Sequence, residues 1–165
     1  MQEHIQNELA SFIANCDWEK IAPHFKEDAA YRVLDWIGCA VAGEHYPQVE
    51  IAQKYFIENG DQGNSTVIGH QTKCSPRTAA FLNGIAGHVC ELDDGHRTAI
   101  GHPGSIAVPT ALALGEHLNA SGADVLKAVI LGYEVFSRLG RTVNPSHYRT
   151  WHTTGPGGTI AAAAA

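Results

Sequence analysis

Three acids and three histidines fall within the 17 residues H-V-C-E-L-D-D-G-H-R-T-A-I-G-H-P-G, positions 88–104. Polar side chains at this density are costly to bury unless they pair with one another. A carboxylate beside an imidazole is the usual means of removing a proton from a carbon next to a carboxylate and of protonating a leaving hydroxyl. The stretch therefore predicts acid–base catalysis. Its alternative interpretation is an exposed helix end with capping acids.

The spacing of the acids depends on where the preceding helix ends. If the helix that carries Phe81 and Ile85 continues through Glu91, Asp94 and Gly95, these three positions share one face. Asp93 would then point more to the side. We expect Glu91 and Asp94 to face one cavity.

The same stretch offers ligands for a metal ion. Asp93, Asp94, His96 and His102 supply oxygen and nitrogen donors suited to zinc, manganese or iron. Their spacing matches no strong ligand motif such as H-E-x-x-H. The sequence therefore favours a site without a metal.

A second segment with possible chemistry is W-H-T-T-G-P-G-G-T, residues 151–159. A glycine-rich turn before a helix presents backbone N–H groups and the positive end of the helix dipole to an anion. His152 would add a proton donor, and Thr153 and Thr154 are candidates to bind the substrate. The alternative is that the glycines serve only close packing.

Hydrophobic periodicity predicts that the elements around these segments form an all-α fold. Residues 5–16 and 25–42 read as helices, and Gly43 ends the second. A third helix runs from Pro47 to Asn59-Gly60, and Ser75 with Pro76 begins a fourth that extends to Gly87. Residues 66–68 look like an isolated extended segment.

The C-terminal half continues in helices. One runs to about Leu118, with Pro109 confining its start or kinking it. The next begins at Ser121 or Asp124 and ends at Gly140. After the glycine-rich turn, Thr159 is a possible cap for an alanine helix. Because the chain stops inside this alanine run, we expect 1–165 to be one truncated helical domain.

Composition excludes several classes of protein. Eleven Lys and Arg against seventeen Asp and Glu give a net charge of −6, and the basic residues form no block, so no nucleic-acid footprint is evident. There is no signal-like N-terminus and no apolar run of membrane-spanning length, which favours a cytoplasmic protein without a membrane partner. The separated Cys16, Cys39, Cys74 and Cys90 are typical of reduced structural thiols.

The two motifs together carry a resemblance. H-V-C-E-L-D-D-G-H…G-H-P-G-S and W-H-T-T-G-P-G-G-T-I-A-A-A-A-A resemble the matching region of the MmgE/PrpD family, which includes 2-methylcitrate dehydratase, cis-aconitate decarboxylase and iminodisuccinate epimerase. Upstream, A-A-Y-R-V-L-D-W-I-G-C-A-V-A-G resembles an early core helix of that family. The segment S-T-V-I-G…A-A-F-L-N-G-I-A-G-H resembles the lead into the acidic motif. Nearly the whole chain is covered.

The resemblance implies which residues form the site. Glu91 stands where the family has an acid two positions before the Asp pair, and His102 and His152 match its pocket histidines. These three are the candidate catalytic residues. Asp94 and His96 would support the pocket and, like Thr153 and Thr154, are candidates to bind the substrate. Gly95 replaces a frequent threonine. The resemblance further implies a helical bundle without its α/β lid domain here, a homodimer and no obligatory cofactor.

The function expected from the resemblance is that of a lyase or isomerase acting on a small polycarboxylate, similar to 2-methylcitrate dehydratase. A histidine or carboxylate would move a proton at the carbon alpha to a substrate carboxylate. The alternative is a non-catalytic helical dimerisation module or an inactive truncated relative. Two observations would distinguish the enzyme from the non-catalytic module: whether the coding region continues past Ala165, and whether the extended chain turns over substrate.

Overall fold

The computed structural model describes residues 2–71 and 73–165, so Met1 and Thr72 of the predicted domain lie outside the described residues. The regular secondary structure of the described part is helical apart from one small hairpin, which confirms the all-α prediction. The α-helices are α1 (Gln2–Ala14), α2 (Pro23–Gly43), α3 (Pro47–Glu58), α4 (Pro76–His88), α5 (Gly104–Leu118), α6 (Gly122–Val143) and α7 (Thr154–Ala164). The short elements are η1 (Trp18–Lys20), β1 (Ser65–Thr66), β2 (Lys73–Cys74) and η2 (His147–Arg149).

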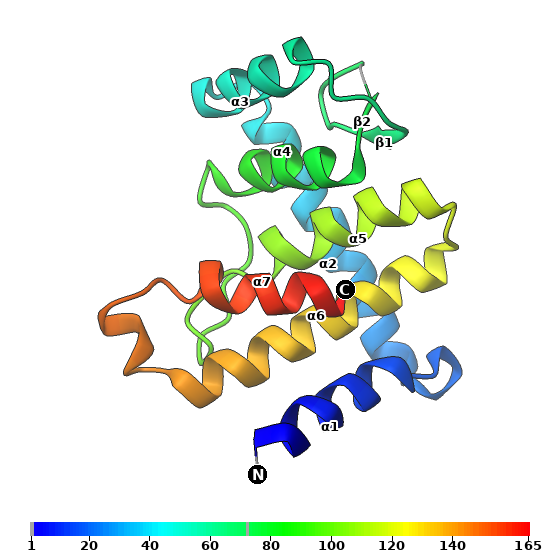
Figure 1. Cartoon of the computed structure of the whole chain (residues 1–165), viewed down its shortest axis with the longest axis vertical. Coiled ribbons are helices and arrows are strands. Elements are labelled where there is room, and N and C mark those ends of the chain that lie inside the picture. The colour runs from blue at the N-terminus through cyan, green and yellow to red at the C-terminus, as the bar shows by residue number, and fades with distance from the viewer. Residues whose placement is uncertain (1, 72) are drawn as a thin grey trace.

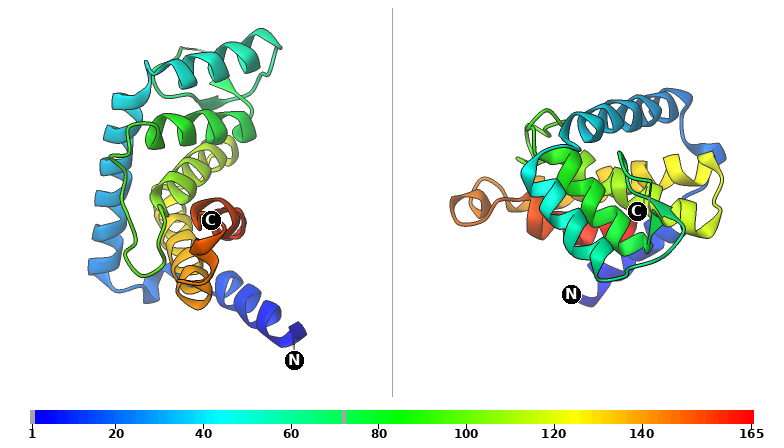
Figure 2. Two further views of the ribbon diagram at one scale, coloured as in Figure 1. Left: turned by 90° about the vertical axis from the view of Figure 1, so that its left-hand side faces the viewer. Right: turned by 90° about the horizontal axis from the view of Figure 1, so that it is seen from above.

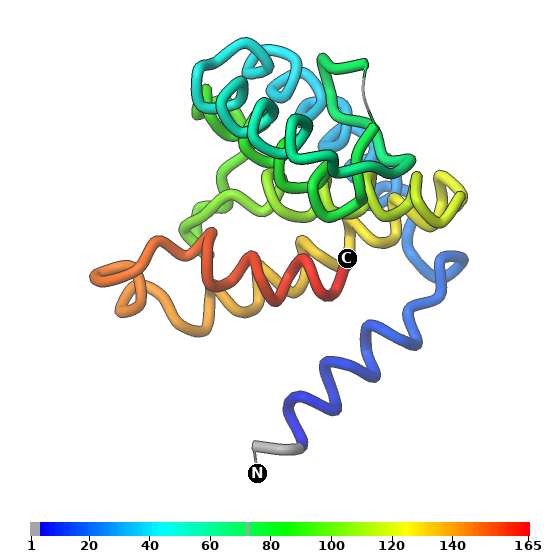
Figure 3. The backbone as a smooth tube through the Cα atoms, turned by 45° about the horizontal axis from the view of Figure 1, so that its top comes forward, coloured from blue at the N-terminus to red at the C-terminus, as the bar shows by residue number. Residues whose placement is uncertain are grey.

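Helices α2, α4, α5 and α6 form the centre of the bundle. Helix α4 packs against α2 and α5, and α6 packs against α5 and α7 (Figure 1). Helix α2 runs along one side of the molecule, and α1 extends from the end of the molecule opposite α3 (Figure 2). The tube view shows that the α4–α5 connection and the segment before α7 lie at the same side of the bundle (Figure 3). Two distant parts of the sequence are thereby brought together.

The main core is built by apolar stripes from the four central helices. Trp36 of α2, Ala86 of α4, Val108 of α5 and Val129 of α6 are all buried in one cluster. Small residues let the helices approach closely: a Cβ on Gly87 would lie 2.4 Å from Nε1 of Trp36. This close packing fixes α4 against α2, and α4 leads directly into the acidic motif.

The cap predictions for two helices are confirmed. Ser75 accepts a hydrogen bond from the backbone N–H of Thr78 at 3.3 Å, and Ser121 accepts one from Asp124 at 3.2 Å. The four cysteines are free thiols, as their spacing indicated. Among the described residues, every helix is too short or too polar to span a bilayer.

Two sequence predictions about elements were wrong. The extended segment is not isolated, because β1 pairs antiparallel with β2, Ser65 opposite Cys74. For Pro109, which lies inside α5, the kink stays a prediction. Gly140 does not end α6, which continues to Val143. Its lack of a side chain serves packing instead, since a Cβ there would lie 2.5 Å from Cβ of Ala99.

The start of α7 also differs from the prediction. Helix α7 begins at Thr154, so Thr159 is not its cap. The glycines and Pro156 belong to the first turns, where proline is tolerated because its missing N–H has no helical partner. Gly158 is needed for contact, since a Cβ there would lie 2.8 Å from Ile106 of α5. The Thr159 hydroxyl donates to the carbonyl of Gly155 over 3.1 Å.

Candidate active site

The acidic motif forms a loop, because α4 does not continue through Glu91. Its last residue is His88, and Glu91 has a φ of 53° in the left-handed region. The proposed helical face of Glu91, Asp94 and Gly95 is therefore wrong. A non-glycine residue in this region interrupts helical geometry, so the chain turns away from the α4 axis.

Internal hydrogen bonds shape the rest of this loop. The N–H of His96 donates to the carbonyl of Gly101 at 2.8 Å, and the N–H of Ile100 donates to the carbonyl of His96 at 2.8 Å. Ile100 has a φ of 52°. Such a conformation is strained for a β-branched side chain, at a cost of roughly 1–3 kcal/mol, and strain of this kind concentrates at functional sites.

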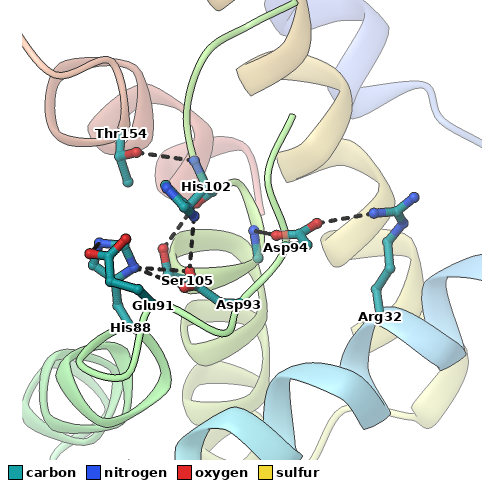
Figure 4. A network of polar contacts seen from close by, with 9 residues as sticks. Arg32, His88, Glu91, Asp93, Asp94, His102, Ser105 and Thr154 are labelled. Atoms are coloured by element: carbon teal, nitrogen blue, oxygen red, sulfur yellow. Dashed lines mark hydrogen bonds and ion pairs between the residues drawn. The ribbon is translucent and has the colours of Figure 1, made fainter. Parts of the chain in front are cut away.

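The loop brings His102 beside the second motif. Its backbone N–H donates to Oγ1 of Thr154 over 3.0 Å (Figure 4). The rings of His102 and His152 are stacked, with centroids 6.0 Å apart and planes inclined by 14°. The ring of Tyr148 lies 5.4 Å from that of His152. Two predicted catalytic histidines thus lie next to each other.

A pocket of about 310 Å³ opens at these histidines. It is lined by Gly95, His96, Arg97, Ile100, Gly101, His102, Tyr148 and His152. Nδ1 of His96 accepts the N–H of Ala99 at 3.1 Å, which fixes the orientation of that ring. Arg97 is exposed at this pocket and carries a positive charge. Arginine with several imidazoles suits an anionic ligand that can exchange protons.

A larger pocket of about 540 Å³ lies between α4, α5 and α7. His88 and Thr154 border it, but most of its lining is apolar, including Phe81, Ile85 and Ile106. Carboxylate substrates need charged or hydrogen-bonding partners. The smaller pocket is therefore the better candidate for the chemistry.

Asp93 lies at the centre of a hydrogen-bonded group that the sequence did not reveal. Its side chain is fully buried, and both carboxylate oxygens lie 3.0 Å from Nδ1 of His88. Nδ1 of His102 lies 3.5 Å from Oδ2 of Asp93. The rings of His88 and His102 pack with centroids 4.8 Å apart. This group lies directly behind the pocket histidine.

Glu91 lies at the edge of this group. Its carboxylate is 3.6 Å from Nε2 of His88, and its side chain is 72% exposed. Glu91 is absent from the lining of the 310 Å³ pocket. Within the described residues its link to His102 therefore runs through His88.

Asp94 faces away from the pocket histidines, toward α2 (Figure 4). Oδ2 accepts from Arg32 at 3.0 Å, and Oδ1 accepts the N–H of Gly104 at 3.0 Å. Burial and the charge of Asp94 raise the pKa of the Tyr133 hydroxyl, which stays protonated and donates to Asp94. Asp94 thus holds the loop against α2 and the start of α5.

The two threonines of the second motif are also bonded within the protein. Thr153 is buried, and its hydroxyl accepts from Nδ2 of Asn144 at 3.0 Å. Asn144 also donates to the carbonyl of Ala99 at 2.5 Å. Thr154 is occupied by the N–H of His102. These contacts tie the start of α7 to the end of α6 and to the histidine loop.

The metal-binding alternative weighed from the sequence is not supported as a set, because Asp94 is turned toward Arg32. A different set does converge: potential ligand atoms of His88, Asp93 and His102 all lie within 4.8 Å of one another. The same atoms are also suited to imidazole N–H groups donating to a shared carboxylate.

Sequence reasoning missed His88, Asp93, Tyr148 and Arg97. His88 and Asp93 were visible as members of the dense motif, but their pairing depends on the turn after α4. Tyr148 lies four residues before His152, and nothing in that spacing indicated a shared pocket. Arg97 was visible only as a basic residue inside an acidic stretch.

Comparison with known proteins places the chain in a family. The model of the MmgE/PrpD N-terminal domain matches residues 7–165. The cis-aconitate decarboxylase-like protein oryM of Aspergillus oryzae is 32% identical over 171 residues, covering 98% of this chain and 36% of that protein. Cis-aconitate decarboxylase of Aspergillus terreus is 32% identical over 155 residues, covering 90% of this chain and 32% of its own length.

The human protein named cis-aconitate decarboxylase is 35% identical over 112 residues, covering 65% of this chain and 23% of that protein. The chain therefore spans about a third or less of the length of these curated relatives. With a family model matching nearly the whole chain, the chain belongs to the MmgE/PrpD family.

Proposed function

We propose that this chain carries the histidine-bearing part of the active site of a lyase or isomerase acting on a small polycarboxylate. The observation that supports this most is the stacking of His102 on His152, 6.0 Å apart, at a pocket that also contains Arg97. Two imidazoles provide a proton acceptor and a proton donor near neutral pH. The arginine attracts a substrate carboxylate.

The substrate class rests on the relatives, which are named as cis-aconitate decarboxylases. We therefore propose cis-aconitate or a similar tricarboxylate, with decarboxylation as the reaction. The C–C bond to one carboxylate breaks, and that carboxylate leaves as carbon dioxide. The electron pair of the broken bond stays with the rest of the substrate, where a carbon takes a proton from an imidazolium. Dehydration and epimerisation use the same proton transfer alpha to a carboxylate, and they are the alternative reactions.

We propose His102 and His152 as the acid–base pair and His96 as a substrate-binding group. Glu91 is the third proposed catalytic residue, acting from the exposed edge of the group through His88, 3.6 Å away. Asp94, Thr153 and Thr154 were expected to bind substrate. Because their polar atoms already bond to Arg32, Asn144 and His102, we propose that they hold the pocket in shape.

Other features remain proposals that rest on the family. They are a homodimer, a cytoplasmic location, no obligatory cofactor, and an α/β lid domain that would complete the pocket. Because the chain spans about a third of its relatives, we propose that these 165 residues alone do not turn over substrate.

The test is an assay of the full-length protein, encoded by the complete coding region, beside the 165-residue chain. Each is supplied with cis-aconitate, 2-methylcitrate and citrate, and carbon dioxide release is measured separately from the addition or loss of water. We expect the full-length protein to release carbon dioxide from cis-aconitate and the 165-residue chain to release none. Ordinary turnover by residues 1–165 would contradict the incomplete-site proposal.

The competing function is a non-catalytic helical module that has kept the fold. It predicts that the full-length protein turns over none of the three acids.

A further inference from the structure

The Asp93 carboxylate has no solvent contact, although it lies only one residue beyond the exposed Leu92. A buried carboxylate needs hydrogen-bond donors around it, because burial removes its hydration. Two of its neighbours are imidazoles. Nδ1 of His88 lies 3.0 Å from each carboxylate oxygen, and Nδ1 of His102 lies 3.5 Å from Oδ2. One carboxylate thus faces two histidines through the same ring atom of each.

Hydrogen bonds hold the backbone of His102 on both sides of its side chain. Its backbone N–H is bonded to Thr154 at 3.0 Å, and its carbonyl accepts from the Ser105 hydroxyl at 3.0 Å. Its Nδ1 is buried and, among the described residues, has no partner at full hydrogen-bond geometry. The Asp93 oxygen at 3.5 Å is the acceptor that a small ring rotation would bring into range. Nε2 is then left for the pocket that His102 lines.

We propose that Asp93 is a positioning residue shared by two histidines. It accepts Nδ1–H from His88 and from His102, and it thereby holds His102 in the tautomer whose Nε2 has a free lone pair at the pocket. The catalytic meaning rests on the proposed function: Nε2 takes a proton from the substrate carbon or returns one to it. The negative charge of Asp93 stabilises the imidazolium while it exists.

His88 has a separate part in this arrangement. Its Nδ1 is equidistant from both carboxylate oxygens, which keeps Asp93 from rotating away from His102. Its ring also packs against that of His102 at 4.8 Å. His88 therefore holds Asp93 in place, and Asp93 in turn orients His102.

The neighbouring Asp94 provides a matched comparison. It has the same side chain in the same loop, but its oxygens are bonded to Arg32 and to the N–H of Gly104. Figure 4 shows the two carboxylates pointing in different directions, Asp93 toward the histidines and Asp94 toward α2. A change at Asp94 perturbs the loop without removing the acceptor at His102.

The direct test is the protonation pattern of the ring nitrogens in the 165-residue chain. Long-range ¹H–¹⁵N spectra, recorded above the pH at which histidine is charged, distinguish a protonated from an unprotonated ring nitrogen. We expect His88 and His102 to be protonated at Nδ1 and unprotonated at Nε2, the tautomer that free histidine disfavours. Asp93→Asn should shift His102 toward the other tautomer, and Asp94→Asn should not.

Three results would overturn the proposal. The first is Nε2–H on His102 in the unaltered chain. The second is a His102 tautomer that Asp93→Asn leaves unchanged. The third is a shift of both histidine signals on chelation and their return with zinc, because a metal ion would then occupy the place of the shared protons. None of these readouts needs turnover, so they are independent of the proposed function.

A kinetic test uses the full-length protein. Asp93→Asn should lower kcat by roughly 10- to 100-fold, the scale for losing a group that orients an imidazole, with KM nearly unchanged. His88→Leu should lower kcat in the same direction, and His88→Asn should restore part of it, because its amide keeps an N–H donor near Nδ1. A loss confined to KM, or equal losses in His88→Leu and His88→Asn, would contradict the positioning role.

Discussion

The backbone N–H of His102 and the hydroxyl of Thr154 form the hydrogen bond that joins the acidic motif to the glycine-rich motif, between residues 52 positions apart in the sequence. Thr154→Val keeps the shape of the side chain and removes the acceptor. Since the His102 N–H is part-buried, we expect a loss of about 1–3 kcal/mol in the free energy of unfolding. Urea titration measures it. Thr154→Ser keeps the hydroxyl, and an equal loss in that variant would disprove the explanation.

The proposed catalytic residues make a second prediction. In the full-length protein, His102→Ala and His152→Ala should each lower turnover by roughly 10²-fold or more, as expected for losing an acid or base. Circular dichroism should show unchanged helical content. His24→Ala, at the start of α2, is the control and should be fully active. Full activity in both pocket variants would remove the basis for the proposed mechanism.

Glu91 lies at the edge of the site, with a side chain that is 72% exposed. Glu91→Gln keeps the shape and some hydrogen bonding but cannot take up a proton at neutral pH. We expect it to lower turnover by less than His102→Ala does. Turnover equal to the unaltered protein would assign the acid–base chemistry to the histidines alone.

Two helical glycines make opposite predictions about stability. Gly87→Ala would place a Cβ 2.4 Å from Trp36, and overpacking of this kind costs about 1–3 kcal/mol. Gly38 has nothing within 4 Å of the same added atom, so Gly38→Ala should stabilise α2 by roughly 0.5–1 kcal/mol. Thermal unfolding of both variants checks the pair. Changes of the same sign would contradict the packing described for α4.

Glu116 predicts how stability depends on pH. Burial acts to raise its pKa, but hydrogen bonds from Lys73 at 2.5 Å and Thr66 at 2.7 Å outweigh it, and the pKa is lowered. A carboxylate with a lowered pKa stabilises the fold above its unfolded pKa of about 4.3, and this is lost as pH falls through the folded pKa.

The variant Glu116→Gln tests this sign. It should be less stable than the unaltered chain by about 1 kcal/mol at pH 7, since the pair is partly exposed, and the difference should shrink below about pH 4. Urea titrations at pH 7, 5 and 3 measure it. Glu134→Gln removes an exposed pair with Arg138 on α6 and controls for loss of a surface charge. A difference that grows toward low pH would be the wrong sign.

The sequence predicted the helices well because their signals are local. Apolar spacing and the Ser75 and Ser121 caps act within one or two turns, and these caps were found where expected. One of the errors concerns a glycine. Gly140 was interpreted as a helix end, whereas its place is set by contact with Ala99, far away in sequence.

For the site, resemblance identified His102 and His152, which lie side by side. The pairing of Asp93 with His88 was missed because it depends on one backbone angle at Glu91, which no periodicity reveals. A helix continued through Glu91 would have separated the two side chains onto different faces. The expected substrate contacts of Asp94 and Thr153 could not be judged before their partners Arg32 and Asn144 were known.

The loop between α4 and α5 is fastened to three other parts of the chain, by Asp94 to α2, by Ala99 to Asn144 and by His102 to α7. A segment held from several sides opens only when its anchors open with it. Its bonded backbone amides, including those of His96, His102 and Gly104, should therefore exchange with deuterium together with the first turn of α7, as one cooperative unit, and more slowly than those of α1.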